Sequence, residues 1–126
     1  MINKIILVGR LGKDPIVRYT QDGSMVTTFN LATGEQWKDK QGERVQKTEW
    51  HNIVSFKKLA EICGSYLTKG MLVYVEGKIQ TRSWEKEGVK QYATEIVAKE
   101  MRMLEQRRKT EETFYEEPPA QDDVPF

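Results

Sequence analysis

Three tryptophans in this chain of 126 residues stand among polar neighbours rather than within apolar runs. They are Trp37, Trp50 and Trp84, and Phe56 follows Trp50 at an even spacing that would place both rings on one face of a strand. Exposed rings of this kind stack on nucleobases at ~1 to 3 kcal/mol per base, whatever the base. A single ring could equally cap a core or fill a subunit interface. The four rings together favour a surface on which bases stack.

Basic side chains accompany these rings, as phosphate binding would require. Lys38 and Lys40 follow the first tryptophan, and Lys58 follows Phe56 closely. Arg82 precedes the third tryptophan by two positions. Some of these cations will simply be solvated, but rings interleaved with cations are typical of proteins that bind single strands.

Charge is distributed unevenly along the chain. Residues 1–109 hold 20 Lys and Arg against 13 Asp and Glu, a net charge of +7, whereas residues 110–126 hold six acidic residues and no basic one. The overall charge of +1 is therefore a near cancellation. A basic body attracts a polyanion, while an acidic tail either keeps the chain in solution or docks to a basic partner.

The sequence argues against catalysis and against a metal or cofactor site. Cys63 is the single cysteine and His51 the single histidine, so neither a disulfide nor a Cys/His zinc site can form within one chain. The segment Gly9–Lys13 lacks the spacing of a phosphate loop. No paired carboxylates with acid/base spacing stand out, which leaves a metal-dependent nuclease as a minor alternative. We therefore expect no enzyme.

Hydrophobic periodicity predicts mostly strands. Strands are expected at residues 3–12, 25–35, 44–56, 71–84 and 89–103, with the second and third forming a long hairpin. Between the third and fourth, an apolar stripe predicts a short helix ended by Gly70; it comprises Leu59, Ile62, Cys63 and Tyr66. Three strands, one helix and two strands is the order of the OB-fold, an all-β, five-stranded antiparallel Greek-key barrel that binds oligonucleotides or oligosaccharides.

The last part of the chain differs from this body. Apolar runs stay far below the ~18 residues that span a bilayer, so we expect a soluble, intracellular protein without membrane association. Residues 1–104 form the predicted barrel domain, and residues 105–126 a disordered linker and acidic tip. The tip ends in Val124, Pro125 and Phe126 behind Asp122 and Asp123, which suits docking of a ring and a carboxylate into a basic, apolar pocket.

Segments spread over residues 2–103 resemble the bacterial-type single-stranded DNA-binding proteins. The matching segments are Asn3–Gly9, Leu11–Pro15, Val17–Tyr19, Thr48–His51, Lys58–Glu61, Tyr74–Gly77 and Thr81–Trp84, in that order, together with the C-terminal tip. Each segment alone is a weak signal, whereas the ordered combination is specific. The linker before the tip is shorter than is usual in that family.

The resemblance implies a homotetramer of OB-folds that wraps single-stranded DNA without sequence preference. It implies base stacking by the four rings named above and phosphate contacts by Lys4, Arg18, Lys40, Lys58, Lys69 and Arg82. It also implies that residues 122–126 recruit helicases, nucleases, primase and polymerase subunits during replication, recombination and repair. The location expected is the cytoplasm, at the nucleoid, and His51 corresponds to a position near a subunit interface.

Two questions stay open at the level of the sequence. An OB module that binds proteins, of the primosome type, would have the same strand order and would use its aromatics at interfaces. Stacking and phosphate contacts also do not separate DNA from RNA, because that choice depends on contacts to the 2′-hydroxyl.

Overall fold

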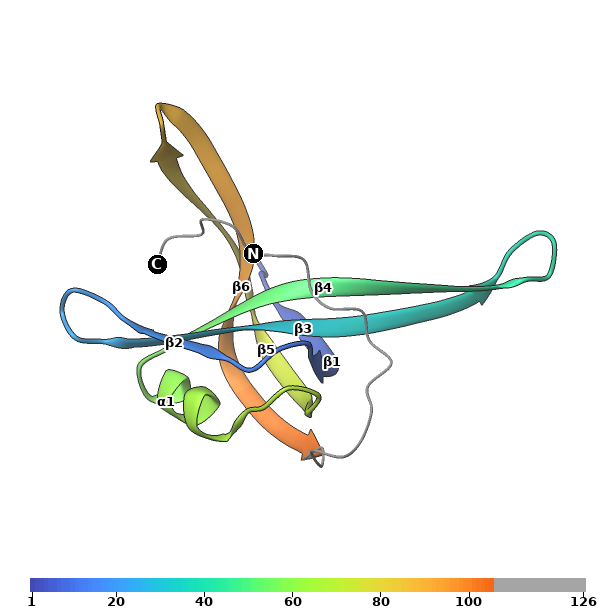
Figure 1. Cartoon of the computed structure of the whole chain (residues 1–126), viewed down its shortest axis with the longest axis horizontal. Coiled ribbons are helices and arrows are strands. Elements are labelled where there is room, and N and C mark those ends of the chain that lie inside the picture. Colours follow the sequence, from blue (N-terminus) through green and yellow to red (C-terminus); the bar gives the residue numbers. More distant parts are fainter. Residues whose placement is uncertain (106–126) are drawn as a thin grey trace.

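The computed structural model describes residues 1–105 of the chain. The elements are β1 (Ile5–Leu11), β2 (Ile16–Tyr19), β3 (Met25–Lys38), β4 (Arg44–Phe56), α1 (Lys57–Tyr66), β5 (Leu72–Lys86) and β6 (Val89–Glu105). The strands form a barrel with α1 at one end, and two long hairpins, β3–β4 and β5–β6, extend from it in different directions (Figure 1). These hairpins are the most prominent features of the molecule.

The barrel is closed by pairing between its first and last strands. Neighbouring strands follow the order β1, β5, β6, β4 and β3, and β3 pairs again with β1. Four of these five pairings are antiparallel, whereas β4 and β6 pair in parallel at two positions. The parallel contact departs from the wholly antiparallel prediction, because the path through α1 and β5 returns β6 beside β4 in the same direction. The closed five-stranded barrel with its helix confirms the predicted OB-fold.

One strand was not expected from the periodicity. The chain bends at Gly12 and Lys13 and then enters β2, which pairs with β3 alone and is exposed along its whole length. The predicted strands near the two hairpin tips are also too short: β3 reaches Lys38 and β5 reaches Lys86. Polar residues continue the backbone pairing beyond the core, where hydrophobic alternation gives no signal.

Two glycines allow strands to approach each other closely. A Cβ atom on Gly9 of β1 would lie 2.1 Å from the carbonyl oxygen of Ala32, and one on Gly77 of β5 would lie 2.1 Å from that of Val97. Both separations are far below van der Waals contact. Gly9 therefore permits the β1–β3 contact that closes the barrel, and Gly77 permits the bulge where β5 bends out of the barrel.

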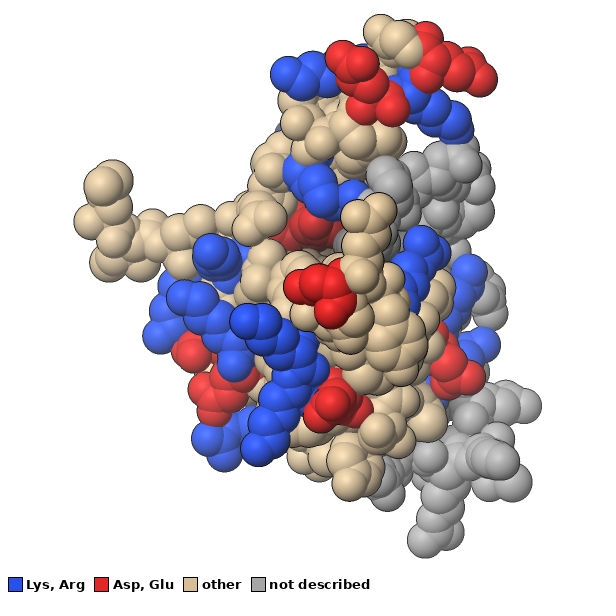
Figure 2. Space-filling view, turned by 90° about the vertical axis from the view of Figure 1, so that its left-hand side faces the viewer, with Lys and Arg blue, Asp and Glu red and all other residues tan. Residues whose placement is uncertain are grey.

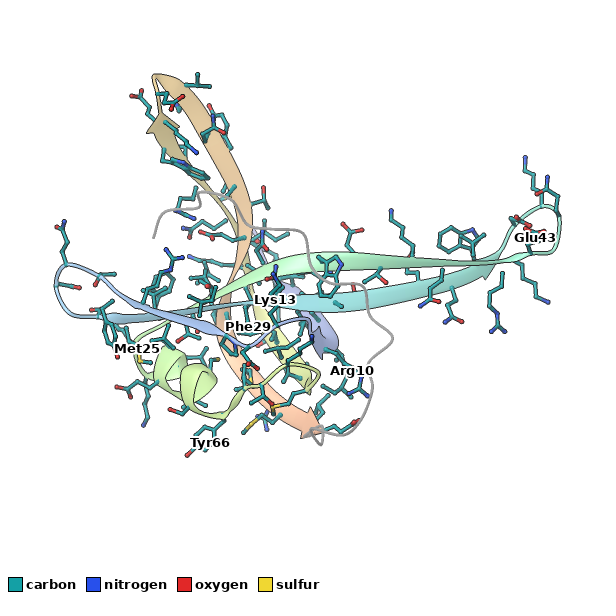
Figure 3. All side chains as sticks on the ribbon, viewed as in Figure 1. Arg10, Lys13, Met25, Phe29, Glu43 and Tyr66 are labelled. Atoms are coloured by element: carbon teal, nitrogen blue, oxygen red, sulfur yellow. The ribbon has the colours of Figure 1, made fainter. Side chains whose placement is uncertain are left out.

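The core fills the barrel beneath α1. It comprises Leu11, Phe29, Leu31, Ile53, Cys63, Leu67, Met71, Val73, Val75, Ile96 and Ala98. Figure 3 shows Phe29 inside the barrel. The hairpin arms lie outside this core, so their geometry depends on strand pairing and local side-chain contacts.

The helix packs on the barrel with a face slightly different from the predicted stripe. Cys63 is fully buried, as expected, and burial raises the pKa of its thiol. Tyr66 was wrongly placed: it is 57% exposed and points outward (Figure 3), while Ala60 is buried. The Thr27 hydroxyl donates a hydrogen bond of 2.7 Å to the carbonyl of Ala60, which fixes the helix rotation. Among residues 1–105, no helix is long and apolar enough to cross a membrane.

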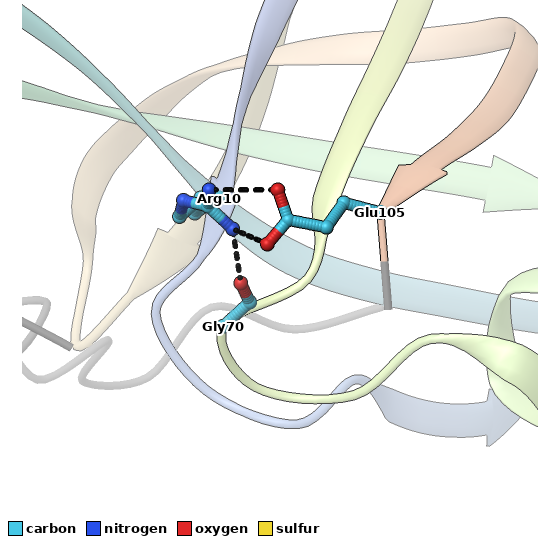
Figure 4. A network of polar contacts seen from close by, with 3 residues as sticks. All are labelled: Arg10, Gly70 and Glu105. Atoms are coloured by element: carbon cyan, nitrogen blue, oxygen red, sulfur yellow. Dashed lines mark hydrogen bonds and ion pairs between the residues drawn. The ribbon is translucent and has the colours of Figure 1, made fainter. Parts of the chain in front are cut away.

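A polar network fixes the end of β6 to the barrel. The guanidinium of Arg10 donates two hydrogen bonds to the carboxylate of Glu105, at 3.2 and 3.1 Å, and one of 3.1 Å to the carbonyl of Gly70 (Figure 4). A bidentate arginine–carboxylate pair is a strong and directional contact. The last residue of β6 is therefore fixed against β1 and the loop before β5.

Candidate nucleic-acid interface

The β3–β4 hairpin carries two of the predicted stacking rings on opposite faces. Its register runs without a shift from Val26 opposite Phe56 to Lys38 opposite Arg44. Trp37 lies opposite Val45, whereas Trp50 lies opposite Ala32, so the two indoles alternate onto different faces. Trp37 is 46% exposed and Trp50 is half-buried. The arm therefore offers an aromatic surface on each side.

The tip of this arm is an ordered turn with basic side chains around it. The Asp39 carboxylate accepts hydrogen bonds from the backbone amides of Gln41 and Glu43, both at 2.9 Å. Gly42 adopts a positive φ of 79°, which completes the turn. The exposed Lys40 lies in this turn, and Figure 3 places Glu43 at the far end of the arm. The tip therefore presents Lys40 from a turn that Asp39 braces.

Phe56 lies where β4 ends and α1 begins. Its place on β4, six residues beyond Trp50 with an uninterrupted register, keeps both rings on one face as predicted. The ring is 44% exposed and lines an open hollow with Lys57 and the β2–β3 turn, residues 20–24. Lys57 has a φ of +57°, a conformation that costs a side-chain-bearing residue roughly 1 to 2 kcal/mol. This sharp backbone turn separates the direction of α1 from that of β4.

Trp84 on the β5–β6 hairpin has a different environment from the other rings. The guanidinium carbon of Arg82 lies 5.1 Å from the centre of the indole, over the ring. Arg82 Nε also donates a hydrogen bond of 3.0 Å to Glu95 Oε1 on β6. Glu95 is only 5% exposed. A buried carboxylate, an arginine and an indole thus form a row across the hairpin, which we call the Glu95–Arg82–Trp84 row.

The remaining predicted phosphate contacts are spread over the molecule. Lys4 pairs with Glu76 at 3.0 Å, and this hydrogen bond and charge raise the pKa of its ammonium group. Arg18 is exposed on β2 and Lys58 on α1. Lys69 is exposed in the loop before β5, where its backbone amide donates to Asp14 at 2.8 Å. Lys58 follows Phe56 by two residues in the chain. Lys4 and Arg82 each have a carboxylate partner.

The surface charges agree with this distribution. Figure 2 views the end of the molecule that bears the β2–β3 turn and α1, and it shows Lys and Arg gathered on one flank with acidic groups among them. At the top, the tip of the β5–β6 hairpin shows both signs. On this face the cations are interspersed with acidic groups.

Sequence reasoning missed two side chains on the β5–β6 hairpin. Tyr92 is 64% exposed, and the Lys90 ammonium lies 5.7 Å from its ring centre. It lies opposite Ser83, on the face away from Trp84. The Lys90-Gln91-Tyr92 segment shows the same polar-flanked aromatic signal that drew attention to the tryptophans. Glu95 gave no such signal, because its importance depends on the register that places it diagonally across from Arg82.

A second surface lies between β1 and the inner part of the β3–β4 arm. Ile6 and Val8 are exposed on β1 and line a pocket with Thr33 and His51. The Thr33 hydroxyl and His51 Nε2 lie 2.8 Å apart, within hydrogen-bond distance, and burial lowers the pKa of the imidazole although the Glu49 charge opposes this shift. Such exposed apolar residues beside a groove suit contact with another protein surface. The predicted docking tip, residues 122–126, lies outside the described residues.

The comparisons with known proteins agree with this geometry. The model of the single-strand binding protein family matches residues 2–104. Single-stranded DNA-binding proteins from Neisseria meningitidis serogroups A and B are 56% identical over 104 residues, which is 82% of this chain. The match spans 60% of the length of each of these relatives.

Solved structures show the same fold. A Plasmodium falciparum SSB in complex with ssDNA has a TM-score of 0.77 at 36% identity, covering 83% of this chain and 96% of the other. A deletion mutant of the single-stranded DNA binding protein from Thermus aquaticus has a TM-score of 0.74 at 33% identity, covering 84% and 52% respectively. The family match over residues 2–104 and the 56% identity are decisive: the chain belongs to the single-strand binding protein family.

Proposed function

We propose that this protein binds single-stranded DNA without sequence preference and without catalysing a reaction. Family members bind DNA and are not enzymes. The observation that carries the proposal is the pair of hairpin arms, which hold Trp37, Trp50 and Trp84 at or near the surface outside the core. Rings in such positions are available to the unpaired bases of a single strand. In a duplex the bases are already paired and stacked on one another.

The mechanism has an electrostatic step and a stacking step. Phosphates are first attracted by the basic body, and the proposed contacts are Lys4, Arg18, Lys40, Lys58 and Lys69; the sixth predicted cation, Arg82, is paired with Glu95. Bases then stack on Trp37, Trp50, Phe56 and Trp84, each contributing ~1 to 3 kcal/mol. Because the rings lie on both faces of one arm and on a second arm, the strand must change direction around the protein. The arms therefore favour wrapping over passage through a single groove.

Fluorescence titration tests this function directly. Oligo(dT) should quench tryptophan emission at low salt, and a duplex of equal length should compete poorly. Equal affinity for duplex and single strand would refute the proposal. A matched oligo(U) measures discrimination against RNA, and alanine at Trp37, Trp50 and Trp84 distinguishes stacking from a protein-interaction module. In that second case the substitutions would disturb assembly and leave DNA affinity unchanged.

We further propose that the protein acts as a homotetramer. The exposed Ile6 and Val8 of β1 supply apolar contacts, and the adjacent pocket, which Glu35, Lys47, Glu49 and His51 also line, supplies polar ones; together they form a surface suited to a second copy. The mass in solution, measured over a dilution series, tests the assembly. Replacing Ile6 and Val8 with Thr should shift the mass towards smaller species, and a wild-type monomer at all concentrations would contradict it.

The acidic tip is proposed to recruit partners in replication, recombination and repair of DNA in the cytoplasm. Phe126 would enter an apolar pocket, while its carboxylate and the preceding Asp122 and Asp123 meet basic side chains. In the proposed division of the chain, the tip follows the barrel as a separate segment and can be removed without cutting a barrel strand. Deleting residues 117–126 should abolish capture of helicase, nuclease, primase or polymerase subunits and leave oligo(dT) binding intact. If the tip also competes for the DNA surface, the deletion tightens binding at low salt only.

A further inference from the structure

The Glu95–Arg82–Trp84 row ends in a buried carboxylate that the DNA-binding proposal does not use. Glu95 is 5% exposed, and its side chain meets the guanidinium of Arg82 at 3.0 Å. A buried carboxylate is costly unless a charged partner satisfies it. Because Glu95 is buried, its charge adds little to the solubility of the arm. Its position therefore points to a role for the contact with Arg82.

The hairpin register explains how the row forms. Arg82 lies opposite Ala93, Trp84 opposite Gln91, and Gln80 opposite Glu95, with no shift in register between these pairs. Residues two apart on a strand share a face, so Glu95, Arg82 and Trp84 project from the same face of the arm. Glu95 lies on the barrel side and Trp84 towards the tip. The guanidinium between them contacts both.

Arg82 is held by this geometry more firmly than an ordinary surface cation. Its side chain is 23% exposed, against 55% for that of Lys4. A planar guanidinium can donate to a carboxylate while it stacks on an indole, which an ammonium cannot do. The carboxylate fixes the guanidinium, and the guanidinium lies over one face of the indole at 5.1 Å. A base can then stack only on the opposite face of Trp84.

We infer that Glu95 is a positioning residue of the single-strand site: through Arg82 it fixes the indole of Trp84 and restricts base stacking to one face. The inference rests on the proposed function. It changes the role of Arg82, whose charge is neutralised within the protein and contributes little to the salt dependence of binding. Glu95 itself does not contact DNA.

The test uses the full-length protein with Trp37→Phe and Trp50→Phe, so that Trp84 is the only tryptophan. In this background Glu95→Gln keeps the size and an accepting oxygen, Glu95→Ala removes the side chain, and Arg82→Gln removes the cation. Glu85→Gln is the matched control, because Glu85 is an exposed acid next to Trp84. Circular dichroism and the mass in solution confirm that each variant is folded and assembled. Should Glu95→Ala fail to fold, Glu95→Gln carries the same test.

The first readout needs no DNA. In both Glu95 variants, Trp84 should show lower fluorescence anisotropy and greater quenching by acrylamide than in the background protein, while Glu85→Gln leaves both unchanged. Unchanged anisotropy and quenching in both Glu95 variants would overturn the inference. Because DNA is absent, this result stands apart from the proposed function, which is tested separately by the binding of oligo(dT) and of duplex to the wild-type protein.

The second readout is the salt dependence of oligo(dT) binding. Arg82→Gln should leave the slope of log K against log salt unchanged, whereas release of the guanidinium in Glu95→Ala should steepen it by up to about 0.7 for each additional phosphate contact. At high salt, where stacking dominates, Glu95→Ala should bind ~3- to 10-fold more weakly. A merely structural role would not steepen the slope. A shallower slope for Arg82→Gln would show a direct phosphate contact and contradict the inference.

Discussion

The two hairpin arms present tryptophans in different ways. On β5–β6, Trp84 lies under an arginine that a buried carboxylate holds. On β3–β4, Trp37 and Trp50 lie on opposite faces among lysines that are exposed in the described structure. The difference suggests a division of labour. In the proposed mechanism, the β5–β6 arm would supply a fixed platform for a base, and the β3–β4 arm would supply cations that respond to salt together with rings on both faces.

The largest effect expected from this comparison concerns the rings themselves. Trp84→Ala should weaken oligo(dT) binding by ~1 to 3 kcal/mol, roughly 5- to 150-fold, because a stacked base loses its platform. The loss should be nearly the same at low and high salt, because no mobile cation is removed. Trp84→Phe, which retains a ring, is the matched control for stacking. A loss that vanished at high salt would show that Trp84 acts through charge and would erase the distinction between the arms.

Removing cations from the β3–β4 arm should have the opposite effect, a loss of affinity that depends on salt. Replacing Lys38, Lys40 and Arg44 with Gln should reduce the slope of log K against log salt by about 2, since each phosphate contact contributes ~0.7 on a single strand. The loss of affinity should be greatest at low salt and small at high salt. Titrations at several salt concentrations measure it, and Lys99→Gln on the barrel strand β6 is the control. An unchanged slope would place the phosphate path elsewhere.

The stability of the protein should depend on pH through His51, which lies on β4 in the part of the same arm next to the barrel. Burial lowers the pKa of His51, so the folded state favours the neutral ring and the unfolded state takes up the proton first as pH falls. Stability from this residue is therefore present above the unfolded pKa of about 6.5 and declines below it. Thermal midpoints from pH 7.5 to 5.5 should fall more steeply in the wild type than in His51→Gln. Parallel curves for the two proteins would exclude this linkage.

Much of the architecture was predictable because the core obeys simple periodicity. The alternation of Phe29 and Leu31 on β3 and the apolar second half of β4 define barrel strands without tertiary information. The order of strands and helix along the chain then pointed to the OB-fold among the possible all-β folds. Beyond the core, β2 and the ends of the arms were missed or shortened, because exposed polar strands are stabilised by pairing with a neighbour rather than by burial.

The candidate site was predictable only in part, for a related reason. A tryptophan among polar residues is visible in the sequence, as is a nearby lysine. The structure adds which face each ring occupies and which cation already has a partner: Trp37 and Trp50 diverge, and Arg82 meets Glu95. Both facts depend on the register between two strands. The distinction between the arms therefore lies in pairings that a single chain segment does not encode.

The smallest effect concerns the turn that sets the register of the second arm. Glu87 and Gly88 connect β5 to β6, with φ angles of 51° and 78°. Two successive positive φ values match a type I′ turn, which favours Asn-Gly and places a side-chain penalty on glutamate. Glu87→Asn should raise the free energy of unfolding by less than about 1 kcal/mol, measured by chemical denaturation. It should leave the fluorescence anisotropy of Trp84 unchanged if Glu95 and Arg82 already fix the ring. An increased anisotropy would show that the turn, rather than the Glu95–Arg82–Trp84 row, positions Trp84.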